Sequence, residues 1–147
     1  MEKRNVLFVM SSLRNGGAER SLVNLLQLLD YDRYNVDLLL FQNEGLFLKQ
    51  VPKAVNIISN CNKLYTLYDN NKAEALKHPY LSAIHMIGTF ISRKKTNSVA
   101  KSRQYRWEHF YKKIVPELTK EYDVAIAYMQ REQTYFLVDK VKAAKKI

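Results

Sequence analysis

Cysteine is almost absent from this chain of 147 residues, in which Cys61 is the only one. An internal disulfide and a multi-cysteine metal site are therefore excluded, and the chain suits a reducing compartment. The histidines are scattered without metal-ligand spacing, and no serine or cysteine lies on a recognisable nucleophile turn. We expect no bound metal and no resident cofactor.

Glycine, proline and long apolar runs are also scarce. There are four glycines and three prolines, and no glycine- or serine-rich linker or internal repeat divides the chain. No apolar run is long enough for a signal-peptide core or a membrane-spanning helix. A hydrophobic content of 47% is nevertheless sufficient for a core. These features predict one domain over residues 1–147, located in the cytoplasm or at the inner face of the membrane.

Positive charge is what the chain has in excess, with a formal net charge of +10. The excess gathers between residues 93 and 113, where Glu108 is the only acidic residue. Such a run attracts nucleic acid, anionic lipid headgroups or phosphorylated substrates through the same field, and a merely solvated helix face is equally compatible with it. The candidate basic surface, for an acceptor or a membrane, consists of Arg93, Lys94, Lys95, Lys101 and Arg103.

The stretch from residue 5 to residue 29 organises the rest. Residues 6–10 form an unbroken apolar run, as expected of a parallel strand covered on both faces. A polar turn with Gly16 and Gly17 follows, and glycines allow another group to approach the backbone closely. Leucines at helical spacing then predict a helix with Glu19 in its first turn, where the macrodipole favours a carboxylate. The free N–H groups at this helix start can bind an anion.

Further strands and helices alternate along the chain. Residues 34–41, 54–58 and 122–128 read as strands, Pro79 opens a helix, and a last helix carries Phe136, Leu137, Val141 and Ala144. The alternation predicts an α/β fold, a three-layer Rossmann-like parallel sheet with strand order 3-2-1-4. A topological switch point then lies between the first and fourth strands, which brings the turns at residues 11–17 and 129–133 together.

Two common phosphate-binding motifs are missing from the glycine turn. It has neither the G-x-G-x-x-G spacing of dinucleotide-binding folds nor the glycine-lysine-serine/threonine end of a P-loop. A different sugar or phosphate corner and a purely conformational role for the glycines both stay open.

Both ends of the chain resemble a known family. The apolar run, the Gly16-Gly17-Ala18-Glu19-Arg20 corner with its leucine helix, and the later segments 34–39 and 122–128 look like the amino-terminal domain of GT-B glycosyltransferases of family 4 (glycosyltransferase group 1). In that family two Rossmann-like domains face each other across a cleft. The first mainly handles the acceptor, and the second binds the nucleotide sugar.

The resemblance implies a function and a set of site residues. It implies the amino-terminal half of a sugar-nucleotide-dependent hexosyltransferase that makes glycans or glycolipids, with a nucleotide sugar and a glycan or lipid-linked acceptor as partners. The family's later acidic motif and phosphate ligands have no counterpart here, so we expect a truncated chain that is inactive by itself. Its catalytic residues are not assigned. The candidate donor- or acceptor-binding residues are Arg14, Asn15, Gly16, Gly17, Glu19, Gln130, Arg131 and Glu132.

Two other functions compete with this one. The first is a basic nucleic-acid-binding module, which needs exposed aromatic residues between lysines and arginines; Tyr105, Arg106 and Trp107 come nearest to this pattern. The second is a flavodoxin-like interaction domain without a site.

Overall fold

The computed structural model describes residues 2–58, 67 and 76–147. The chain divides into two compact units, the first built from residues up to 60 and from 117 onward, and the second from residues 61–116. Cys61 and the asparagines Asn60, Asn62, Asn70 and Asn71 lie outside the described residues.

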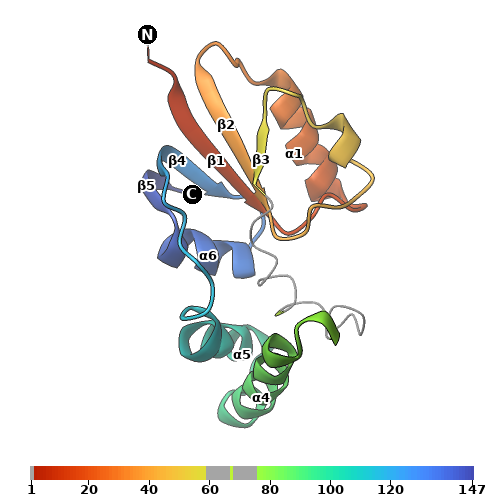
Figure 1. Ribbon diagram of the computed structural model, residues 1–147, viewed down its shortest axis with the longest axis vertical. Coiled ribbons are helices and arrows are strands. Elements are labelled where there is room, and N and C mark those ends of the chain that lie inside the picture. Colours follow the sequence, from red (N-terminus) through yellow and green to blue (C-terminus); the bar gives the residue numbers. More distant parts are fainter. Residues whose placement is uncertain (1, 59–66, 68–75) are drawn as a thin grey trace. The chain divides into compact units, whose positions relative to one another are not determined.

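The first unit is an α/β fold around one parallel sheet (Figure 1). Its strand order is β3-β2-β1-β4-β5, which confirms the predicted Rossmann-like layout and the order 3-2-1-4. Each pair of neighbouring strands is parallel, with Val6 of β1 opposite Val36 of β2 and Val124 of β4. The strands are β1 (Arg4–Met10), β2 (Tyr34–Leu40), β3 (Asn56–Ile58), β4 (Glu121–Ala127) and β5 (Lys142–Lys146).

Helices cover both faces of this sheet. Helix α1 (Gly17–Leu28) buries Leu22, Val23 and Leu26 against alternate side chains of β1 and β2. On the opposite face α6 (Glu132–Lys140) contributes Phe136, whose ring meets Phe41 edge-on with centroids 5.7 Å apart. Because both faces are covered, the central strands are apolar at nearly every position. The short 3-10 helix η1 (Leu48–Gln50) precedes β3.

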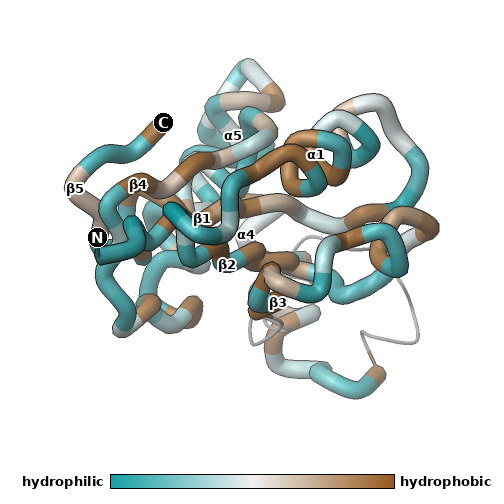
Figure 2. The backbone as a smooth tube through the Cα atoms, turned by 90° about the horizontal axis from the view of Figure 1, so that it is seen from above, coloured by the Kyte–Doolittle hydropathy of each residue, from teal (hydrophilic) through white to brown (hydrophobic). Residues whose placement is uncertain are grey.

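The last helix is shorter than predicted. Helix α6 ends at Lys140, and Val141 is already extended, so the assignment of Val141 and Ala144 to that helix was wrong. Residues Lys142–Lys146 instead form the edge strand β5 along β4. Figure 2 shows this strand as largely hydrophilic. Lysine-rich edges are common because they discourage pairing with a further strand, and here backbone pairing outweighed the weak strand propensity of the sequence KAAKK.

The second unit is helical in the described part. Helix α4 (Pro79–Lys95) begins at the predicted proline, which has no N–H to leave unsatisfied at the first helical position. Helix α5 (Val99–Arg106) packs on α4 and continues into the π-helical turn η2 (Trp107–Tyr111). Among the described helices, none has both the length and the apolar character needed to cross a membrane.

One charged side chain is buried in the sheet. Asp37 of β2 is 3% exposed and accepts hydrogen bonds from Tyr122 Oη at 2.7 Å, Lys120 Nζ at 2.9 Å and Asn56 Nδ2 at 3.0 Å. Burial alone would raise the pKa of the Asp37 carboxyl, but the three hydrogen bonds and the charge of Lys120 hold this pKa below its ordinary value of 3.8. Burial, and next the hydrogen bond to Asp37, raise the pKa of Tyr122 far above its ordinary value of 10.0.

Removing the Tyr122 hydroxyl tests this cluster. Tyr122→Phe leaves a buried carboxylate one donor short, so we expect a loss of about 1–3 kcal/mol in the free energy of unfolding, measured by urea denaturation at neutral pH. Tyr128→Phe is the matched control, because it removes a more exposed hydroxyl. Equal losses in the two variants would contradict a special role for the Asp37 cluster.

The cluster also predicts the direction of the pH dependence. The pKa of Asp37 is lower in the folded than in the unfolded chain, so its contribution is complete above the ordinary carboxyl pKa of 3.8 and disappears as the pH falls through the folded value. The fall in stability below that pH should be smaller in Tyr122→Phe than in the wild type.

Candidate functional site

The candidate site lies at the carboxyl edge of the sheet. Strands β1 and β4 are parallel neighbours, so the turns that follow them emerge at the same edge, as predicted for the switch point. Tyr128, just after β4, fastens the two sides: its N–H donates to the Val9 carbonyl at 3.1 Å, and its hydroxyl lies 2.9 Å from Ser21 Oγ of α1. Sequence reasoning did not single out Tyr128 or Ser21 as part of this edge.

A loop after β2 supports the glycine corner. The Leu13 N–H donates to the Glu44 carbonyl at 3.0 Å, and the Leu13 carbonyl accepts from Phe47 N–H at 3.1 Å. Arg14 forms an ion pair with Glu44. Gly45 has φ of 131°, and a β-carbon there would collide with the Leu13 carbonyl. The signal for this support in the sequence is Gly45 itself, since a glycine just after a predicted strand indicates a turn.

The two corner glycines differ in their surroundings. Gly16 precedes α1 in an ordinary extended conformation, and a β-carbon added to it would collide with the Glu19 carboxylate. Gly17 is the first residue of α1, and a β-carbon added there would meet no atom within 4 Å. The space at the corner is therefore open beside Gly17 and occupied beside Gly16.

The Glu19 carboxylate occupies part of the space at the start of α1 where the sequence predicts anion binding. It is the third residue of α1, and its carboxylate folds back over Gly16, as the glutamate of a capping box does. No side chain at Gly16 caps the helix start. The carboxylate thus complements the positive end of the macrodipole, and a bound diphosphate must share this end of α1 with it.

The turn after β4 presents polar side chains on a strained backbone. Gln130 and Arg131 are exposed, and Arg131 has φ of 151°, a conformation that usually favours glycine. Strain of this kind costs on the order of 1–3 kcal/mol and is typical of functional turns. Glu132 begins α6 and is half-buried with an interaction of its own, while Asn15 on the other turn is exposed.

The candidate basic residues lie in the other unit. Arg93, Lys94 and Lys95 form the last turn of α4, where positive charge also suits the helix dipole. Lys101 and Arg103 lie on α5. The candidate residues therefore form two groups, one at the sheet edge and one on the helical unit.

The cavity described in the first unit lies away from the carboxyl edge of the sheet. A cavity of about 540 Å³ lies at the opposite, amino end of the strands, lined by Asn5, Tyr122 and Lys142 among others. In the described ranges, histidine, cysteine, aspartate and glutamate nowhere gather in a group of three that could hold a metal ion.

Family models, curated proteins and solved structures gave no match to this chain.

The unequal glycines predict unequal effects of alanine. Gly17→Ala places a methyl group in open space on a helical residue, and we expect it to raise the melting temperature by about 2 °C, from a gain of roughly 0.4–1 kcal/mol. Gly16→Ala must displace the Glu19 carboxylate and should therefore lower the melting temperature. In a Glu19→Ala background the penalty at residue 16 should vanish, which a thermal double-mutant cycle measures. A penalty that persists there would contradict the assigned contact.

Proposed function

We propose that this chain is the acceptor-side amino-terminal domain of a sugar-nucleotide-dependent GT-B glycosyltransferase that makes glycans or glycolipids. The family resemblance supports it at the glycine corner and in the strands at both ends of the chain. In this proposal a second domain supplies the groups that neutralise the donor diphosphate, so the isolated chain does not transfer sugar. The parent enzyme acts in the cytoplasm, at the inner face of the membrane.

The open space beside Gly17 is the observation that carries this proposal. It lies at the start of α1, where backbone N–H groups lack partners within the helix. It also lies at the switch point of a parallel sheet, the usual position of ligands in such folds. A donor phosphate or an acceptor hydroxyl can approach the backbone there without meeting a side chain. Asn15, Gln130 and Arg131 supply exposed polar groups along the same edge.

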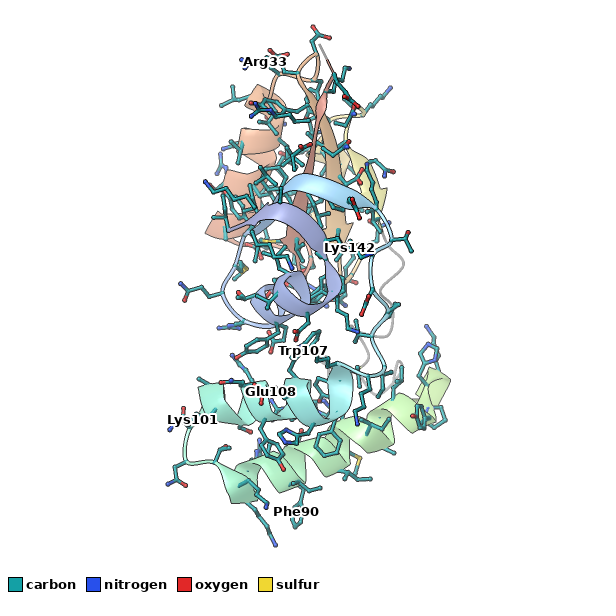
Figure 3. All side chains as sticks on the ribbon, turned by 90° about the vertical axis from the view of Figure 1, so that its left-hand side faces the viewer. Arg33, Phe90, Lys101, Trp107, Glu108 and Lys142 are labelled. Atoms are coloured by element: carbon teal, nitrogen blue, oxygen red, sulfur yellow. The ribbon has the colours of Figure 1, made fainter. Side chains whose placement is uncertain are left out.

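The acceptor surface is assigned to the helical unit. On α4, Tyr80, Met86, Ile87 and Phe90 are exposed by 55–70%, and Phe90 projects outward (Figure 3). The Lys94 ammonium lies 4.5 Å from the centroid of the Phe90 ring, so basic and apolar groups share this surface. Aromatic and apolar side chains beside lysines and arginines suit an anionic membrane surface that presents a lipid-linked acceptor.

Nucleic-acid binding receives less support from the aromatic residues. Tyr105 stacks on His109, with ring centroids 3.9 Å apart and an interplanar angle of 13°. Arg106 donates to Ser92 and Ser102. These two residues are thus engaged within the helical unit instead of forming an open platform for bases.

A valine at residue 17 tests the corner in the full-length parent enzyme. Gly17→Val fills the open space with a branched side chain, so transfer to the acceptor should be lost while the melting temperature changes little. Asn24→Val is the control, because it makes a similar change on the exposed side of α1 away from the corner. Full transfer by Gly17→Val, measured with radiolabelled nucleotide sugars, would overturn the proposed donor or acceptor contact.

The membrane assignment predicts charge-dependent vesicle binding. Co-sedimentation of the chain should increase with phosphatidylserine and decrease with salt, since each basic residue near the surface contributes about 1 kcal/mol. Phe90→Asp should weaken this binding about tenfold or more, because one apolar anchor is lost and a negative charge is added that the anionic headgroups repel. The control is Leu28→Asp on α1, where the side chain is 84% exposed in the other unit. Equal binding to phosphatidylcholine vesicles would contradict the assignment.

A further inference from the structure

A second cavity, of about 420 Å³, lies within the helical unit at the junction of α4 and α5. Three arginines line it, one from the end of α4 and two from α5, and no aspartate or glutamate is among its described lining residues. The remaining lining is small and mostly polar. The lining residues are Arg93, Thr96, Asn97, Ser98, Val99, Ser102, Arg103 and Arg106.

The start of α5 adds backbone donors to this cavity. Ser98 is the N-cap residue, but its side chain makes no cap hydrogen bond. The first N–H groups of α5 have no acceptor within the helix, and the first hydrogen bond of the helix runs from Ser102 N–H to the Ser98 carbonyl at 2.8 Å. The positive end of the α5 dipole and the arginines therefore act on the same space.

Arg106 is held in place by a buried pair of serines. Its Nη1 donates to Ser102 Oγ at 3.0 Å and to Ser92 Oγ at 3.2 Å, and the two hydroxyls lie 2.8 Å apart. Ser92 is 0% and Ser102 6% exposed. The Arg106 Nε–H is buried and has no hydrogen-bond partner in the described structure. An oriented guanidinium with a spare donor is a group prepared for an oxyanion.

We propose that this cavity binds a phosphate group. A phosphate offers several strong acceptor oxygens and a double negative charge, which match planar arginine donors and an uncapped helix start. The cavity is larger than one inorganic phosphate needs, so the group is expected to be a phosphomonoester carried on a larger molecule, either a soluble sugar phosphate or a lipid headgroup. This proposal uses only residues of the helical unit and does not depend on the assignment as a glycosyltransferase.

A structural role for the same charges makes a different prediction. Arg93 lies at the carboxyl end of α4, where it also stabilises the helix dipole, and Lys95 does the same two residues later without lining the cavity. Helix stabilisation should therefore respond equally to replacing either residue. Phosphate binding should respond to Arg93 alone.

The experiment is a titration of the whole chain with inorganic phosphate, followed by the amide resonances of Ser98 to Ser102. We expect saturable shifts at these amides, and Arg93→Gln should weaken binding about tenfold, as expected for a lost charge-assisted contact. Lys95→Gln, with the same change in charge, should leave the affinity unchanged. Absent shifts at the start of α5, or equal loss in both variants, would overturn the proposal. Because Arg93 is exposed, Ser92→Ala provides a second variant at a buried position. It removes one of the two hydroxyls that hold Arg106 in place.

Two further arms distinguish the sources of the phosphate. Glucose 1-phosphate represents soluble sugar phosphates, and vesicles of phosphatidylcholine with phosphatidic acid represent lipid headgroups. A soluble ligand predicts tighter binding of glucose 1-phosphate than of inorganic phosphate. A lipid ligand predicts vesicle binding that inorganic phosphate displaces and that Arg93→Gln weakens more than Lys95→Gln. If neither probe competes with inorganic phosphate at the α5 amides, the assignment to a phosphomonoester is wrong.

Discussion

The pairing of β1 with β4 is the constraint on which the first unit depends. Val6 lies opposite Val124, so β1 gains this neighbour only after the whole segment 61–116 has been synthesised between β3 and β4. Closing a loop of this length costs entropy that grows only slowly with its length, and the buried apolar strands on both sides of β1 offset that cost. The same pairing creates the switch point, because β4 returns to the free side of β1 and brings its turn beside the glycine corner.

The buried Asp37 adds specificity to this arrangement. Its carboxylate accepts hydrogen bonds from Asn56 of β3, from Tyr122 of β4 and from Lys120 just before β4, so it joins strands on both sides of β1. A wrong strand register would leave the charge buried without these donors, at a cost of several kcal/mol. The cluster thus favours one register of β2, β3 and β4 around β1.

The two candidate surfaces offer different kinds of contact to a ligand. The corner at Gly17 offers backbone N–H groups in open space, with Glu19 already placed over the neighbouring residue. The helical unit offers arginines around a cavity and an exposed apolar face on α4. The first suits a small anionic or hydroxyl group at a sheet edge, and the second suits a phosphorylated or membrane-bound partner. In the proposed enzyme these are the contact with the reacting groups and the contact with the acceptor's carrier.

The sequence by itself determined the strands β1, β2 and β4 and the helix after the glycine corner, because apolar runs and leucines at helical spacing are local patterns. The strand order followed from the alternation of strands and helices, since parallel neighbours need a crossover connection. It also indicated α4 from Pro79. Tertiary structure alone decided the rest. Strand β5 exists because β4 offered an unpaired edge to KAAKK, and Asp37 is buried because three distant donors meet it. The space beside Gly17 is open and that beside Gly16 is occupied because the Glu19 carboxylate folds over Gly16. The basic run was visible from residues 93–113, but only the packing of α4 on α5 placed three of its arginines around one cavity. Contacts between residues far apart in the chain leave no periodic signal, so these features had to come from the fold.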